Sequence, residues 1–84
     1  MKRIDYSKDA VKSLRCLPTN TSRLIRSKIE QYAADPAAQA NNVKALKGMK
    51  GVYRLRVGDW RVLFSETGEI IAVIKVRPRG GAYE

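Results

Sequence analysis

The sequence contains no histidine and only one cysteine, Cys16. A single cysteine cannot form an internal disulfide, and without histidine there is no Cys/His cluster to hold zinc. Histidine is also the side chain whose ordinary pKa lies nearest neutrality, so any acid–base chemistry must use other groups. Cys16 lies in an apolar periodic stretch, and we expect it to fill the core rather than to act as a nucleophile. This composition fits a reducing cytoplasm and suggests no metal and no small-molecule cofactor.

Long apolar runs and acidic residues are also scarce. No stretch approaches the ~18 apolar residues of a membrane span, so we expect no membrane partner. Lys and Arg number 17 against 8 Asp and Glu, which gives a formal net charge of +9. Such an excess suits a polyanionic partner, either nucleic acid or an acidic protein, although a general solubility charge is the alternative. Apolar residues make up 44% of the 84, enough for one folded domain over residues 1–84.

The first half of the chain predicts one strand and two helices. Alternating residues indicate a short strand over residues 2–6. Ser7 is a suitable N-cap for a helix that ends near residue 16. Apolar residues at helical spacing predict a second helix over about 20–34, and residues 36–42 are small and polar, as in a connector.

The second half alternates with a period of two, which is typical of strands. We expect strands over residues 52–57, 60–65 and 69–76. A two-residue turn begins at Gly58, and Gly68 is expected to supply a positive φ in the next loop. The predicted fold class is α+β: a small antiparallel β-sheet with an N-terminal helical hairpin packed on one face, in the order β-α-α-β-β-β.

The segment YRLRVGDWRVLF, residues 53–64, alternates cationic and apolar side chains on both sides of its turn. A two-residue turn pairs Arg56 with Arg61 and places Arg54 on the same face, away from the helices. Like charges directly opposite in a sheet are destabilising, and the neighbouring sequence offers no obvious carboxylate on that face. One interpretation is a solvated charged face. The other is an anion site, because the planar guanidinium fork binds two phosphate oxygens at once.

Further candidates follow the last strand and precede the sheet. Arg77 and Arg79 leave the last strand beside the arginine face, and Tyr83 lies near the end of the chain. An exposed Tyr83 can stack on a base or transfer a proton, whereas a terminal aromatic packed on the sheet is the alternative. A second basic run is either solvated surface or a source of phosphate contacts. It contains Lys44, Lys47 and Lys50.

YRLRVGDWRVLF, preceded by KALKG and followed by VIKVRPRGGAY, resembles the RelE/ParE toxin superfamily of bacterial type II toxin–antitoxin modules. The resemblance covers nearly the whole chain and implies the same sheet with an N-terminal helical hairpin. Its RelE branch implies a ribosome-dependent mRNA endoribonuclease that inhibits translation, with a cognate acidic antitoxin, the ribosome and mRNA as partners. Its ParE branch shares the fold but inhibits DNA gyrase. A non-catalytic basic module that binds RNA or an acidic protein is a further alternative.

The resemblance also implies which residues are catalytic in an RelE-type enzyme. Arg61 and Arg79 would stabilise the charge on the phosphate in the transition state, and Arg54 and Arg56 would orient the phosphate and assist proton removal. Tyr83 would stack on the base or act as an acid. Two departures from the family pattern are visible: the first two basic positions are often lysine, and only one residue follows Tyr83. Retention of all five positions favours the RelE branch over ParE.

Overall fold

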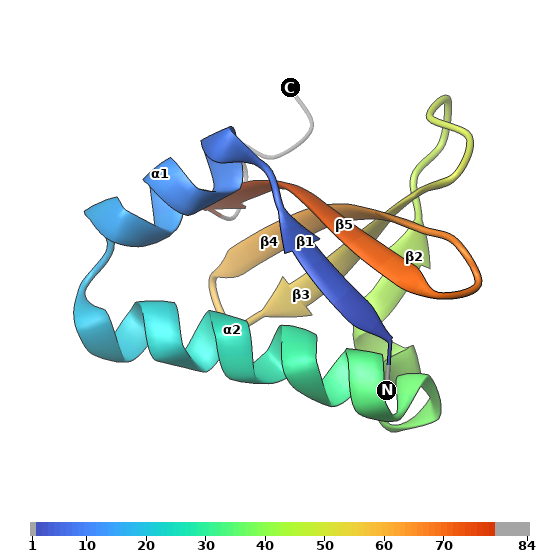
Figure 1. The fold of residues 1–84 in the computed structure, drawn as a ribbon, viewed down its shortest axis with the longest axis horizontal. Helices are drawn as coiled ribbons and strands as arrows, with labels where there is room; N and C mark the ends of the chain where they lie inside the picture. Colours follow the sequence, from blue (N-terminus) through green and yellow to red (C-terminus); the bar gives the residue numbers. More distant parts are fainter. Residues whose placement is uncertain (1, 79–84) are drawn as a thin grey trace.

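A computed structural model describes residues 2–78 of the chain (Figure 1). The elements are β1 (Arg3–Tyr6), α1 (Lys8–Cys16), α2 (Thr19–Ala34), the 3-10 helix η1 (Pro36–Asn42), β2 (Val43–Ala45), β3 (Val52–Val57), β4 (Trp60–Glu66) and β5 (Ile70–Pro78). The predicted α+β class is confirmed, with the helical hairpin preceding most of the sheet. No helix in this described part is long and apolar enough to cross a bilayer.

The five strands form one sheet in the order β1-β5-β4-β3-β2. β1 pairs parallel with β5, and the remaining pairs are antiparallel, so the sheet is mixed rather than purely antiparallel. The sequence did not indicate β2 or η1. The three residues of β2 are too few to show an alternating pattern. β2 forms because its backbone pairs with the edge of β3.

The helices form where local capping and apolar spacing favour them. Ser7 Oγ accepts a hydrogen bond from the Ala10 N–H at 3.0 Å, which caps α1 as predicted. α1 buries Ala10 and Leu14, but Cys16 is exposed, so the expectation that it fills the core is wrong. Cys16 lies two positions beyond Leu14, and two helical positions rotate a side chain to nearly the opposite side.

The core lies between the helical hairpin and one face of the sheet. It is built from alternate strand residues that meet the apolar sides of α1 and α2. The strands contribute Leu55, Val57, Val62, Phe64, Ile71, Val73 and Val76. These buried positions fix which side of every strand faces away from the helices, because neighbouring strand residues point to opposite faces.

The two hairpin turns of β3–β4 and β4–β5 differ in how they use glycine. Gly58 has φ +57°, the left-handed region that favours glycine, as the two-residue turn requires. Gly68 does not adopt a positive φ, so that prediction is wrong. Thr67 closes the second loop instead: its N–H donates to the Ile70 carbonyl at 2.9 Å, and its hydroxyl accepts from the Ile70 N–H at 3.2 Å.

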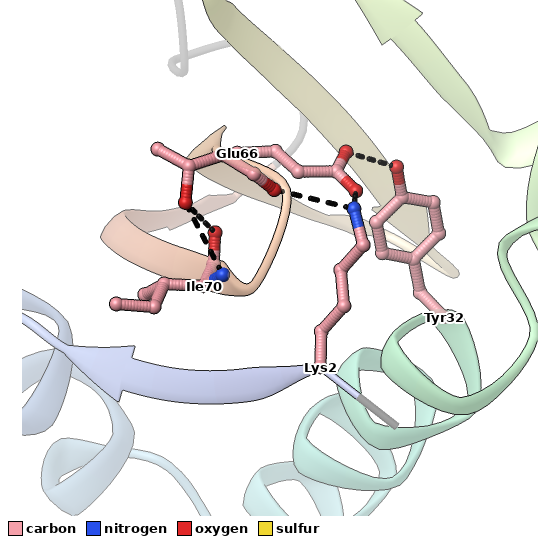
Figure 2. Close-up of polar contacts among 5 residues, drawn as sticks. Lys2, Tyr32, Glu66 and Ile70 are labelled. Atoms are coloured by element: carbon pink, nitrogen blue, oxygen red, sulfur yellow. Dashed lines mark hydrogen bonds and ion pairs between the residues drawn. The ribbon is translucent and has the colours of Figure 1, made fainter.

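A polar cluster at the C-terminal end of β4 joins this strand to α2 and to the N-terminal segment before β1 (Figure 2). The Glu66 carboxylate forms an ion pair with Lys2 and accepts a hydrogen bond from the Tyr32 hydroxyl at 2.6 Å. Burial alone would raise the pKa of Glu66, but the hydrogen bonds from Lys2 and Tyr32 outweigh it and lower that pKa. Burial and the adjacent carboxylate raise the pKa of Tyr32. The cluster ties the N-terminal strand to α2 and β4.

Candidate nucleic-acid interface

Three arginines lie in one row across the three central strands, one position from the β3–β4 turn, on the face away from the helices. Arg56 of β3 is directly opposite Arg61 of β4, and Arg61 is directly opposite Arg77 of β5. Cross-strand neighbours have Cβ atoms about 5 Å apart, so the three side chains leave the sheet close together. We call Arg56, Arg61 and Arg77 the arginine row. The predicted Arg56–Arg61 pairing is confirmed.

Arg61 does not extend into solvent, as the interpretation of a solvated charged face would require. Its side chain is buried, with 9% of the residue exposed. One guanidinium nitrogen, Nη1, donates to the Gly58 carbonyl at 3.2 Å and to the Trp60 carbonyl at 3.0 Å. The guanidinium therefore lies against the β3–β4 turn, where main-chain oxygens stabilise its charge.

Arg77 has an acidic neighbour that the sequence pattern did not reveal. Its Nη2 atom lies 3.7 Å from the Asp9 carboxylate of α1. Parallel pairing of β1 with β5 brings the start of α1 beside the end of β5, and no local pattern predicts that approach. Arg56, in contrast, is exposed and forms no ion pair with any residue between 2 and 78.

A second set of basic side chains lies two ladder positions further from the turn, on the same face. Arg54 of β3 pairs in register with Lys44 of β2 on one side and with Leu63 of β4 on the other. Leu63 is in turn opposite Lys75 of β5. The sequence interpretation did not include Lys75, although its position two residues before Arg77 on one strand predicts a shared face. The structure therefore brings Lys44 and Arg54 together beside the arginine row.

The remaining predicted residues lie apart from this surface or cannot be placed. Lys47 and Lys50 are exposed in the loop that joins β2 to β3, which extends away from the sheet (Figure 1). Arg79 and Tyr83 lie outside the described residues. The predicted set of five is thus represented in the structure by Arg54, Arg56 and Arg61.

The chemistry available at this surface is that of a cationic anion site. Within residues 2–78, no three His, Cys, Asp or Glu side chains gather closely enough to hold a metal ion. Clustered guanidinium groups can instead bind phosphate oxygens through charge-assisted, bidentate hydrogen bonds. The sheet fixes their spacing, because each arginine sits on a hydrogen-bonded strand rather than on a loop.

Comparison with known families agrees with this architecture. Residues 4–83 match the family model for the ParE toxin of the type II toxin–antitoxin system parDE. The chain belongs to this toxin family. The match covers nearly the full sequence, including the helical hairpin and all the basic positions discussed above, and it confirms the superfamily that the sequence motifs indicated.

Individual relatives of this toxin family carry the RelE name. A protein of Methanocaldococcus jannaschii designated as the toxin RelE1 is 31% identical over 84 residues, covering 96% of this chain and 93% of that protein. The RelE–RelB complex of Pyrococcus horikoshii contains a chain with 30% identity and a TM-score of 0.78, with 96% and 98% of the two chains covered. The RelB–RelE antitoxin–toxin complex of Methanococcus jannaschii gives 26% identity and a TM-score of 0.74, with 94% of each chain covered.

Proposed function

We propose that this toxin is a metal-independent, ribosome-dependent mRNA endoribonuclease that inhibits translation in the cytoplasm. The observation that carries the proposal is the arginine row on the face away from the helices. Arg56 and Arg61 occupy one rung of the sheet, and an anion that contacts both guanidinium groups would reduce the repulsion between their like charges. A phosphate of RNA supplies that anion, and the +9 net charge favours such a polyanion.

The proposed chemistry is internal attack of the ribose 2′-OH on the neighbouring phosphate. The reaction needs removal of the 2′-OH proton, stabilisation of the negative charge on phosphorus and protonation of the departing 5′-oxygen. Because the chain has no histidine, positioning and electrostatic stabilisation must supply most of the catalysis. A ribosome that holds the mRNA in a fixed conformation would supply the positioning that 84 residues do not.

The exposure and the hydrogen bonds of each described arginine determine the role that we assign to it. Arg61, held against the turn by two main-chain oxygens, is pre-organised to stabilise charge on the phosphate. Arg56 is exposed, and together with Arg54 it would orient the phosphate and assist loss of the 2′-OH proton. Arg79 would add to charge stabilisation, and Tyr83 would stack on a base or donate a proton. The lysines at 44, 47 and 50, with Arg77, would contact RNA outside the cleaved bond.

We also propose that a cognate acidic antitoxin binds this toxin. Two of the similar structures are complexes of RelE with RelB. An acidic partner complements 17 basic side chains against 8 acidic ones, and its binding over the arginine row would block access to RNA.

Inhibition of DNA gyrase is the second candidate, because the matching family model carries the ParE description. A gyrase inhibitor needs a protein-binding surface but no phosphate site. The arginine row and the RelE designation of the relatives above 25% identity favour the nuclease.

One pair of assays separates these functions. Purified toxin is added to ribosomes programmed with a defined mRNA, and in parallel to gyrase acting on relaxed plasmid. Cleavage of mRNA only when ribosomes are present supports the proposal. Intact mRNA together with inhibited supercoiling would instead show that the protein is a gyrase inhibitor of the ParE type. Intact mRNA and normal supercoiling would leave a non-catalytic binding module.

A further inference from the structure

A pocket of about 460 Å³ opens beside the β3–β4 turn, where the arginine face meets the helical layer. Figure 1 shows this turn next to the first half of α2. The pocket is lined by residues of α2, of the end of η1 and of the hairpin tip. They are Leu24, Lys28, Asn42, Arg56, Val57, Gly58, Asp59 and Arg61. Arg56 and Arg61 therefore belong both to the arginine row and to this pocket.

The lining has the composition of a site for a nucleotide. Lys28, Arg56 and Arg61 contribute three positive charges against the single carboxylate of Asp59. Lys28 forms no ion pair with any other residue of the described chain, 2–78, and its charge is available to a ligand. The pocket volume lies within the usual range of roughly 300–1,000 Å³ for small-ligand sites.

The pocket also has an apolar wall and a fixed amide. Leu24 is 49% exposed, one of two large apolar side chains in the described chain that are so open. It can cover the apolar face of a ribose or base. The Asn42 side-chain amide donates to Gln39 Oε1 at 3.3 Å, which holds Asn42 in place at the end of η1.

From this geometry we propose that the pocket is a second nucleotide subsite for single-stranded RNA. The phosphate preceding or following the cleaved one binds Lys28 and Arg56, and its sugar or base packs on Leu24. This inference rests on the proposed function, because the arginine row must hold RNA for a neighbouring nucleotide to reach the pocket. It assigns Lys28, Asn42 and Leu24, which lie outside the sheet, to substrate binding.

The test measures the affinity of the purified toxin for a short RNA whose 2′-OH groups are methylated, so that it cannot be cleaved. Trp60 is the only tryptophan and adjoins two lining residues, so its fluorescence reports binding. Lys28→Ala should weaken binding about five- to tenfold at low salt. It should also reduce the slope of log K against log salt by about 0.7, the loss of one phosphate contact on a single strand. Lys28→Arg should retain most of the affinity.

The matched control is Lys12→Ala, which removes an exposed lysine from α1, outside this pocket. It should change the affinity less than twofold. Wild-type affinity and salt slope in Lys28→Ala would overturn the subsite, as would a loss of antitoxin binding alone. Wild-type toxin that fails to cut mRNA on ribosomes, while its RNA affinity still depends on Lys28, would refute the nuclease proposal and leave the subsite supported.

Discussion

Arg56 and Arg61 occupy the same rung of the β3–β4 ladder but experience different surroundings. Arg56 is exposed, whereas Arg61 is 9% exposed and donates to two main-chain carbonyls of the turn. The two like charges therefore differ in their surroundings. Main-chain carbonyls hold the Arg61 guanidinium, whereas the Arg56 guanidinium is open to a ligand. An anion bound between them would be gripped by one rigid and one adaptable guanidinium group.

We expect Arg61→Ala to abolish mRNA cleavage and also to destabilise the fold. The two carbonyls lose a charged donor, so the free energy of unfolding should fall by about 1–3 kcal/mol. The lost hydrogen bonds should outweigh the gain from removing the repulsion between Arg61 and Arg56. Urea denaturation and ribosome cleavage assays on the same preparation measure both effects.

Arg56→Ala is the matched control for that experiment, since it removes the opposing arginine without removing a buried hydrogen bond. Its unfolding free energy should equal or slightly exceed that of the wild type, because a repulsion is lost. Its cleavage rate should nevertheless fall. An Arg56→Ala variant that is as unstable as Arg61→Ala would contradict the assigned difference between the two side chains.

Tyr83 lies outside the described residues, and its role stays a prediction from the sequence. If its hydroxyl donates a proton, Tyr83→Phe should lower single-turnover cleavage on ribosomes by roughly 10²-fold or more. If the ring stacks on a base, Phe should cleave almost normally, and Ala should lose about 1–3 kcal/mol of substrate interaction. Wild-type cleavage by Tyr83→Ala would remove this residue from the site.

The Glu66 cluster predicts a loss of stability in acid. Because the pKa of Glu66 in the folded protein lies below its ordinary value of 4.5, its contribution is present above about pH 4.5. That contribution disappears as the pH falls through the lowered pKa. Glu66→Gln removes the titrating charge but keeps an oxygen for Tyr32. Its unfolding free energy should therefore change less than that of the wild type between pH 5 and 3.

Glu69→Gln provides the comparison for Glu66, because Glu69 is an exposed carboxylate of the same hairpin and forms no ion pair within residues 2–78. Its acid profile should follow that of the wild type. Identical acid profiles for Glu66→Gln and wild type would show that the cluster does not contribute to pH-dependent stability.

Substitution of Gly58 should be costly for conformational reasons alone. A Cβ at this position meets no atom within 4 Å, but φ is +57°. Gly58→Ala should therefore destabilise the protein by about 1–2 kcal/mol, the cost of the left-handed region. Gly68→Ala has similar space without a positive φ, and should leave stability unchanged or slightly raised. Thermal unfolding of the two variants compares them directly.

The alternating pattern was sufficient to predict the hairpin that carries the arginines. A period of two and a glycine suited to a two-residue turn fixed the register, so that Arg56 was expected opposite Arg61 and is found there. The start of α1 was also predictable, since Ser7 caps this helix by a local hydrogen bond. The motif order was specific enough to indicate the toxin family. These features depend on neighbours within a few residues along the chain.

Only the tertiary structure decided what surrounds each arginine. The parallel pairing of β1 with β5 brings Asp9 to Arg77, and the packing of α2 beside the turn places Lys28 and Arg56 in the lining of one pocket. The hydrogen bond from the Arg61 guanidinium to the Gly58 carbonyl depends on the conformation of the turn, which the residue types alone do not determine. The Asp9–Arg77 contact and the approach of α2 to the turn, in contrast, join segments tens of residues apart. They depend on how strands and helices pack, which a local pattern of apolar and charged residues does not encode.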